Sequence, residues 1–252
     1  MKWFLNRDPR PTARLRLVCL PYAGGGAAVY KDWHLHFDDD VEVLSVQLPG
    51  RGWRIRETPG TDLSRTADDV TEALRPLTDR PLLLFGHSYG AWLGLLVSKR
   101  LEALGTAPLA LAASGRRAPS HHRADPPLRE LSDEEFVKEI QSRYGPIHPK
   151  ILAEPDILAL TLPTLRADVA ALETYDHGPG PHVECPVAAL GGTDDPIVPV
   201  GDLASWRRET GGPCEVRAFP GGHFYFEKDP RPLANYLRGR IDSEWTAEAG
   251  RP

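Results

Sequence analysis

The chain has 252 residues, of which 41% are hydrophobic and 26% are charged, and its formal net charge at pH 7 is -5. These values are typical of a globular protein, and the negative charge argues against nucleic acid as the main partner. No segment approaches the roughly 18 consecutive apolar residues of a membrane span, and the apolar stretch near the N-terminus is too short for a signal peptide. We therefore expect one domain over residues 1–252, in the cytoplasm and without a membrane partner.

The cysteines of the chain are three in number and widely spaced: Cys19, Cys185 and Cys214. An odd number without a Cys-x-x-Cys pair or a histidine-rich companion indicates neither a disulfide framework nor a zinc site. Each cysteine is predicted to be a small apolar residue of the core.

Strand-like apolar runs alternate with a helical pattern in the first half of the chain. Strands are predicted at residues 14–20, 41–48, 81–85 and 109–113. Between the second and third of them, apolar residues recur every three or four positions from Leu63 to Leu77. This spacing predicts an amphipathic helix, with Thr61 or Ser64 as its cap.

The alternation stops between residues 120 and 180, where proline-separated helical patterns are predicted at residues 133–144, 156–162 and 165–175. Ser132 is expected to cap the first of them. The whole segment is interpreted as a helical lid inserted into the domain.

Strands and helices alternate again toward the C-terminus. Strands are predicted at residues 187–190 and 216–219, with helices across residues 202–209 and around Leu233 and Tyr236. Strands that alternate with helices favour an α/β fold, in which helices cover both faces of a mostly parallel sheet.

The third predicted strand ends abruptly in Gly86-His87-Ser88-Tyr89-Gly90, and a helical pattern follows at once. A Gly-x-Ser-x-Gly between a strand and a helix is the context of a nucleophile elbow, where the serine hydroxyl is exposed on a strained turn. The alternative is an ordinary serine in a glycine-rich turn. We expect the side chain of His87 to point away from that of Ser88.

Two later strand ends carry groups that can activate a serine hydroxyl. Asp194 and Asp195 follow the strand at residues 187–190, and His223 follows the strand at residues 216–219. The order serine, aspartate, histidine is that of α/β-hydrolases, and a serine needs a histidine base oriented by an acid. The residues alone do not decide between Asp194 and Asp195. A third aspartate, Asp168, is most simply an ion-paired helix residue whose pair contributes little.

The first predicted strand runs into a glycine-rich loop, Pro21-Tyr22-Ala23-Gly24-Gly25-Gly26. A nucleotide-binding loop is the alternative, but the chain has neither a Gly-Lys-Ser/Thr nor a Gly-x-Gly-x-x-Gly motif there. The loop is better suited to hold an oxyanion.

Together these residues resemble the type II thioesterases, free-standing α/β-hydrolases that accompany nonribosomal peptide and polyketide synthases. The resemblance extends over nearly the whole chain, and the combination of motifs is narrower than Gly-x-Ser-x-Gly alone. The motifs that carry it are Leu17-Val18-Cys19-Leu20-Pro21-Tyr22-Ala23-Gly24-Gly25, Val46-Gln47-Leu48-Pro49-Gly50-Arg51, Gly86-His87-Ser88-Tyr89-Gly90-Ala91, Ser114-Gly115-Arg116 with Ala118-Pro119, Leu162-Pro163-x-Leu165-Arg166-Ala167-Asp168, Gly192-x-x-Asp195-Pro196 and Gly222-His223-Phe224.

The resemblance implies a catalytic triad of Ser88, Asp195 and His223, with the backbone N-H groups of Ala23 and Tyr89 as the oxyanion hole. It also implies hydrolysis of acyl thioesters on the phosphopantetheine arm of acyl or peptidyl carrier proteins, without a metal or cofactor of the enzyme's own. We expect a monomer. Arg116, Arg117 and Arg123 are hypothesised to form a basic surface for an acidic carrier.

Two other functions fit the same motifs. One is a general serine esterase or amidase that acts on small soluble substrates. The other is a binding protein with a hydrolase fold that has lost turnover, although its usual sign, a damaged triad, is absent from this sequence.

Overall fold

The computed structural model describes residues 2–121, 126–144, 153–180 and 182–249. Its centre is a seven-stranded sheet in which β1 pairs antiparallel with β3 and all other neighbours are parallel. The strands lie side by side in the order β1 (Phe4–Leu5), β3 (Val41–Val46), β2 (Leu15–Leu20), β4 (Leu82–His87), β5 (Ala110–Ser114), β6 (Val187–Gly192) and β7 (Cys214–Phe219). This arrangement confirms the predicted α/β-hydrolase class of fold.

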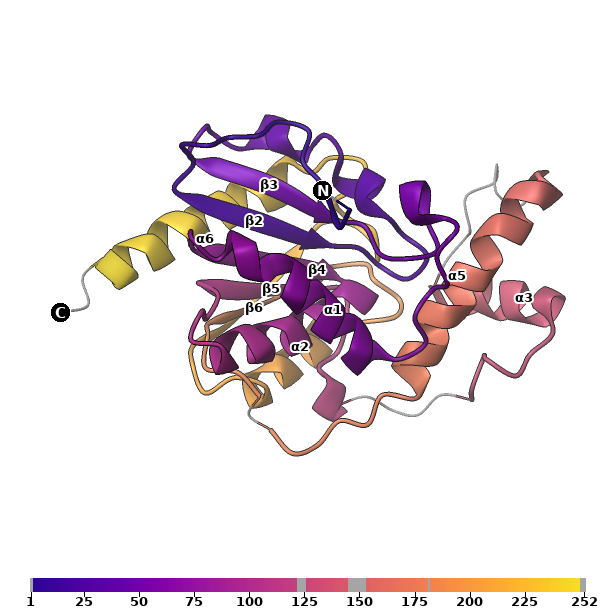
Figure 1. The fold of residues 1–252 in the computed structure, drawn as a ribbon. Coiled ribbons are helices and arrows are strands. Elements are labelled where there is room, and N and C mark those ends of the chain that lie inside the picture. The colour runs from indigo at the N-terminus through magenta and orange to yellow at the C-terminus, as the bar shows by residue number, and fades with distance from the viewer. Residues whose placement is uncertain (1, 122–125, 145–152, 181, 250–252) are drawn as a thin grey trace.

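Helices cover both faces of the sheet, as the buried runs of the strands predict (Figure 1). One face packs against α1 (Leu63–Leu74), α2 (Tyr89–Ala103) and the 3-10 helix η6 (Val200–Arg208). The other packs against the short turns η1 (Ala27–Tyr30) and η2 (Trp33–His36) and against α6 (Arg231–Ala249). Consecutive strand residues point to opposite faces, so both sides of each central strand lie in a core.

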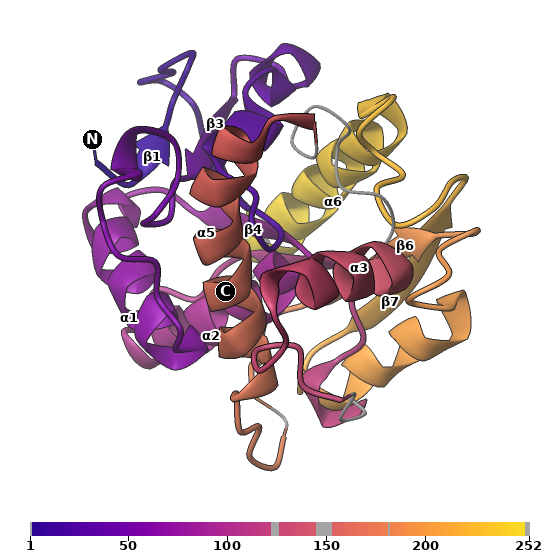
Figure 2. The same cartoon turned by 90° about the vertical axis from the view of Figure 1, so that its right-hand side faces the viewer.

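Two helices, α3 (Asp133–Tyr144) and α5 (Pro155–Glu173), come between β5 and β6 in the chain. Figures 1 and 2 show them together beyond the carboxyl ends of the parallel strands. They share a small apolar cluster of their own, made by Leu128, Phe136, Ile140, Leu162 and Val169. That this segment acts as a lid, with limits at residues 120 and 180, stays a prediction.

Several local expectations differ from the structure. The cap of α1 is Asp62, whose carboxylate accepts from the N-H of Arg65 at 3.0 Å, instead of Thr61 or Ser64. The predicted helices at residues 156–162 and 165–175 are one helix, α5, with Pro163 inside it. The free energy gained by burying several turns of α5 exceeds the free energy lost with the hydrogen bond that Pro163 cannot make. The predicted cap of α3 is confirmed, because Ser132 and Glu135 bond each other's N-H groups.

One smaller feature was not predicted. The two-residue strand β1 was not expected, because its pattern is too short to distinguish from a loop. The helix predicted at residues 202–209 is present as a 3-10 helix over residues 200–208. All three cysteines are free, as expected. Within the part of the chain that the structure describes, no helix combines the length and apolar character needed to cross a membrane.

The first turn of α2 lies directly against the end of β2. A β-carbon on Gly90 would collide with the carbonyl oxygen of Leu20 and would lie 2.8 Å from that of Pro21. Both obstacles are backbone atoms, which cannot move aside as a flexible side chain does. The contact therefore requires glycine at position 90.

Gly90→Ala should lower the free energy of unfolding by at least about 3 kcal/mol, because overpacking against backbone forces strands apart. Gly201→Ala is the matched control, since nothing lies within 4 Å of a β-carbon there. The control should change stability by less than about 1 kcal/mol. Urea unfolding of both variants measures the difference, and equal stabilities would contradict the contact.

Candidate active site

Ser88 lies at the junction between β4 and α2, with φ of 54° and ψ of -109°. It is the one non-glycine residue with a positive φ in the described ranges. Such a conformation costs about 1–3 kcal/mol and persists only where the surroundings enforce it. Here the backbone on both sides of Ser88 is closely packed, because a β-carbon on Gly86 would collide with the backbone of Gly90. This is the geometry of a nucleophile elbow.

His223 and Asp195 lie against each other at the ends of β7 and β6. The Nδ1 atom of His223 is 2.8 Å from Oδ2 of Asp195, and both side chains are almost completely buried. The other oxygen of Asp195 accepts from the N-H groups of Ile197 and Val198 at 2.8 and 3.2 Å. Asp194 is exposed. The carboxylate of Asp195 thus fixes the imidazole with Nδ1-H as donor and leaves Nε2 as acceptor.

His223 also lies close to the elbow. Its ring centroid is 4.8 Å from that of His87, the residue before Ser88, although β5 and β6 separate β4 from β7. The structure therefore brings Ser88, His223 and Asp195 to one end of the sheet. Their assignment as a catalytic triad stays a prediction.

His87 does not belong to this group. Its ring is fully buried, and its Nδ1 atom bonds the hydroxyl of Ser114 on the neighbouring strand at 2.9 Å, as expected for a side chain directed away from Ser88. Burial lowers the pKa of His87 well below its usual value, and the nearby His223 lowers it further. His87 is therefore a neutral packing residue beneath His223.

The glycine-rich loop after β2 is held from two sides. Within the loop, the N-H of Gly25 donates to the carbonyl of Tyr22 at 2.9 Å. From α5, the carboxylate of Asp168 accepts from the N-H of Gly24 at 2.7 Å. Ala23 lies between these two anchors, half-buried against the core. The oxyanion-hole roles of Ala23 and Tyr89 stay predictions.

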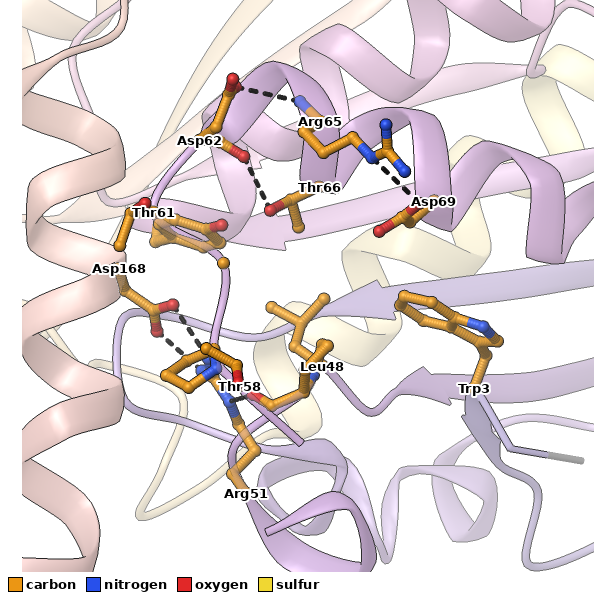
Figure 3. A pocket seen from close by; sticks show the side chains of 14 residues that line it. Trp3, Leu48, Arg51, Thr58, Thr61, Asp62, Arg65, Thr66, Asp69 and Asp168 are labelled. Atoms are coloured by element: carbon orange, nitrogen blue, oxygen red, sulfur yellow. Dashed lines mark hydrogen bonds and ion pairs between the residues drawn. The ribbon is translucent and has the colours of Figure 1, made fainter. Parts of the chain in front are cut away.

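Asp168 also forms a buried, two-pronged ion pair with Arg51 (Figure 3), at 2.7 and 2.8 Å. Arg51 additionally donates to the carbonyl of Gly25 at 3.0 Å. The ion pairing of Asp168 was expected and is confirmed. The pair is buried, since the side chains of Asp168 and Arg51 are only 2% and 8% exposed, and its contribution to stability stays a prediction. The pair ties α5 to the loop after β3 and to the glycine-rich loop. Sequence alone gave no signal that these two motifs meet.

Arg51 and Asp168 also line a cavity of about 300 Å³ (Figure 3). Trp3, Leu48 and the first turn of α1 form much of its wall, and Tyr89 closes one side. Neither Ser88 nor His223 lines it. The cavity therefore lies beside the elbow, since Tyr89 lines it, but it does not include the side chain of Ser88 or of His223.

The hypothesised basic surface does not form as expected. Arg116 is buried, with its guanidinium 4.4 Å from the ring centroid of Trp92. Arg117 pairs with Asp202 at 2.6 Å. Arg123 lies outside the described residues. The part of the hypothesis that concerns an exposed Arg116 is wrong, because its neighbours in the fold enclose it.

Asp168→Asn should lower the free energy of unfolding by about 3–5 kcal/mol, because it leaves the buried charge of Arg51 without a partner. The matched control is Asp133→Asn, which removes the exposed pair between Asp133 and Arg166. That control should cost about 1 kcal/mol or less. Denaturant unfolding measures both, and similar losses would contradict a structural role for the buried pair.

The neutral state of His87 should make stability depend on pH. Below a pH of about 6.5 the unfolded chain protonates this histidine while the folded chain does not, so stability falls with falling pH by up to about 1.4 kcal/mol per unit. His87→Gln should remove this contribution and flatten the dependence between pH 6.5 and 5. His177, whose pKa is also lowered by burial, retains its own contribution in both proteins. The same slope in variant and wild type would contradict the neutral assignment.

Comparison with known proteins identifies the family of the chain. A family model described as thioesterase domain matches residues 15–237. The chain is 40% identical to a probable cadicidin biosynthesis thioesterase of Streptomyces griseus over 89% of its own length and 62% of that protein's, and 39% identical to thioesterase PikA5 of Streptomyces venezuelae over 95% and 85%. Among solved structures, the type II thioesterase BorB from the borrelidin biosynthetic cluster is 35% identical, with a TM-score of 0.84 over 95% of this chain and 96% of that one. The arrangement of Ser88, His223 and Asp195 thus lies in a chain that belongs to the thioesterase family.

Proposed function

We propose that the protein hydrolyses acyl thioesters carried on the phosphopantetheine arms of acyl or peptidyl carrier proteins, by a Ser88-His223-Asp195 mechanism. The observation that carries the proposal is the 2.8 Å contact between Asp195 and His223, next to a serine held at positive φ. The relatives support the substrate class, since one is a type II thioesterase of the borrelidin biosynthetic cluster.

The first half of the reaction forms an acyl-enzyme. Nε2 of His223 takes the proton of Ser88 as its hydroxyl oxygen attacks the thioester carbonyl. The carbonyl oxygen becomes an oxyanion, which the N-H groups of Ala23 and Tyr89 stabilise. Asp195 stabilises the imidazolium that forms. When the carbon-sulfur bond breaks, His223 gives its proton to the leaving phosphopantetheine thiol.

The second half releases the acid. His223, neutral again, takes a proton from water as the water oxygen attacks the acyl-serine carbonyl. The second oxyanion occupies the same place, and its collapse returns the proton to Ser88. Each oxyanion donor is commonly worth about 10²- to 10³-fold in rate. In this role the loop that Asp168 anchors at Gly24 holds the donor of Ala23 in place.

The carrier-bound thioester is the substrate because the enzyme family is associated with chain assembly, where stalled or incorrect acyl groups block a synthase. Removal of such groups frees the thiol of the arm for a new cycle. The protein itself requires no cofactor in this proposal, since the phosphopantetheine belongs to the carrier. We propose that it acts in the cytoplasm as a monomer.

Release of an acyl group from a phosphopantetheinylated carrier protein tests the function. Wild type should release the acid, and Ser88→Ala and Asp195→Asn should slow release by about 10³- to 10⁴-fold. Asp194→Asn is the matched control. Its side chain is exposed, so the rate should stay close to that of the wild type.

Other outcomes separate the alternatives. Rapid cleavage of small oxygen esters without release from the carrier would indicate a general esterase. Tight binding of the acyl-carrier without turnover would indicate a binding protein. Loss of activity with Asp194→Asn and not with Asp195→Asn would overturn the assignment of the acid.

A further inference from the structure

A second cluster of titratable side chains lies outside the candidate active site. It consists of His177 and His182, in the segment before β6, and Glu209, at the end of η6. One potential ligand atom from each residue lies within 4.8 Å of the others. Glu209 is buried and His177 is half-buried, with side chains 0% and 9% exposed. Two imidazoles and a carboxylate are a ligand set that proteins use for zinc.

The buried atoms of this cluster are not satisfied by the protein. Nε2 of His177 is 3.0 Å from Oε2 of Glu209, yet neither atom has a hydrogen bond of acceptable geometry, and Nδ1 of His177 has none either. An unsatisfied buried polar group costs about 1–3 kcal/mol. Polar atoms that lie close together without a hydrogen bond between them are expected where both bind the same third partner.

Glu209 and His182 also have backbone partners outside the cluster that orient their side chains. The other oxygen of Glu209 accepts from the N-H of Ser120 at 3.1 Å. Nε2 of His182 is 3.1 Å from the carbonyl of Gly178. A histidine that donates one ring N-H to a backbone carbonyl leaves the other nitrogen free to bind a metal, and this pairing is common around metal sites.

One neighbour opposes a cation. The ammonium of Lys99, from α2, lies 3.3 Å from Nδ1 of His182, which is the nitrogen that Gly178 leaves available. Metal binding must therefore displace this ammonium from the ring. Because like charges repel, Lys99 should weaken the affinity for a divalent cation, and its removal should strengthen it.

We propose that His177, His182 and Glu209 form a binding site for a divalent transition-metal cation, with Zn²⁺ as the best match to two imidazoles and one carboxylate. A bound ion would join the segment before β6 to the end of η6 and, through Ser120, to the segment after β5. The site contains no residue of the proposed triad, so its role is structural. This proposal differs from the expectation that the chain holds no metal. That expectation was based on cysteine spacing, which gives no information about a site made by two histidines and a glutamate distant from them in the sequence.

Titration calorimetry of untagged, chelator-treated protein with ZnCl₂ tests the proposal, with thermal unfolding as a second readout. We expect one saturable site per chain and a rise in melting temperature, since a ligand that binds only the folded state stabilises it. His182→Ala and His177→Ala should each weaken binding by at least about 100-fold, because loss of an outer-shell partner alone commonly costs 10–100-fold. Mg²⁺, which prefers oxygen ligands, should cause no shift.

Two further variants make the test specific. Lys99→Ala should tighten Zn²⁺ binding by about tenfold, the opposite direction from loss of a ligand. His34→Ala, which removes one of two closely spaced histidines in η2, is the matched control and should leave affinity unchanged. Circular dichroism checks that each variant folds, and if His177→Ala unfolds, His182→Ala and Lys99→Ala decide. Absence of a saturable site, unchanged binding in His182→Ala, or weaker binding in Lys99→Ala would overturn the proposal.

Discussion

The candidate active site depends on the close backbone contact between the first turn of α2 and the end of β2. Gly90 lies so near the carbonyl oxygen of Leu20 that no side chain fits between them. Because β2 and β4 are adjacent in the sheet, this contact brings the glycine-rich loop after β2 beside the turn that carries Ser88. A serine at positive φ is strained, and the packed backbones around it keep it there. Fold stability and the position of Ser88, the candidate nucleophile, therefore have the same origin.

Asp195 and His223, the candidate acid and base, meet because two loops continue the pairing of their strands. The ladder between β6 and β7 ends at Gly192 and Phe219, but the N-H of Thr193 still bonds the carbonyl of Phe219 and that of Asp194 the carbonyl of Gly221. This pairing exposes the side chain of Asp194, while Asp195 is buried against His223. Asp194 and Asp195 thus differ in burial because the paired backbone directs their side chains to different sides.

Local patterns in the sequence were sufficient for the parallel strands of the sheet and for the elbow. The run that ends at Gly86 and the order of Ser88, the aspartate pair and His223 follow from spacing and strand length alone. What the sequence did not contain was the outcome of tertiary contacts. The continuity of α5 through Pro163 depends on burial that no local propensity records, and the buried pairing of Asp168 depends on Arg51, which lies far from it in the chain. The cap of α1 is different, because its hydrogen bond is local. It was missed because Thr61 and Ser64, on either side of Asp62, are also residue types that cap helices.

The two halves of α5 are held to the domain in different ways. After Pro163, Thr164 donates to the carbonyl of Gly50, and Asp168 holds both Arg51 and the N-H of Gly24. Before Pro163, Leu160 is 60% exposed.

Displacement of the second half would break a buried ion pair and release the glycine-rich loop. Among the described residues, the first half makes no ion pair or hydrogen bond to the sheet domain that compares with these contacts. Pro163, which lacks the N-H that would bond the preceding turn, lies at the boundary. Motion of the half before Pro163 would therefore leave the glycine-rich loop in place, because the half after it holds that loop.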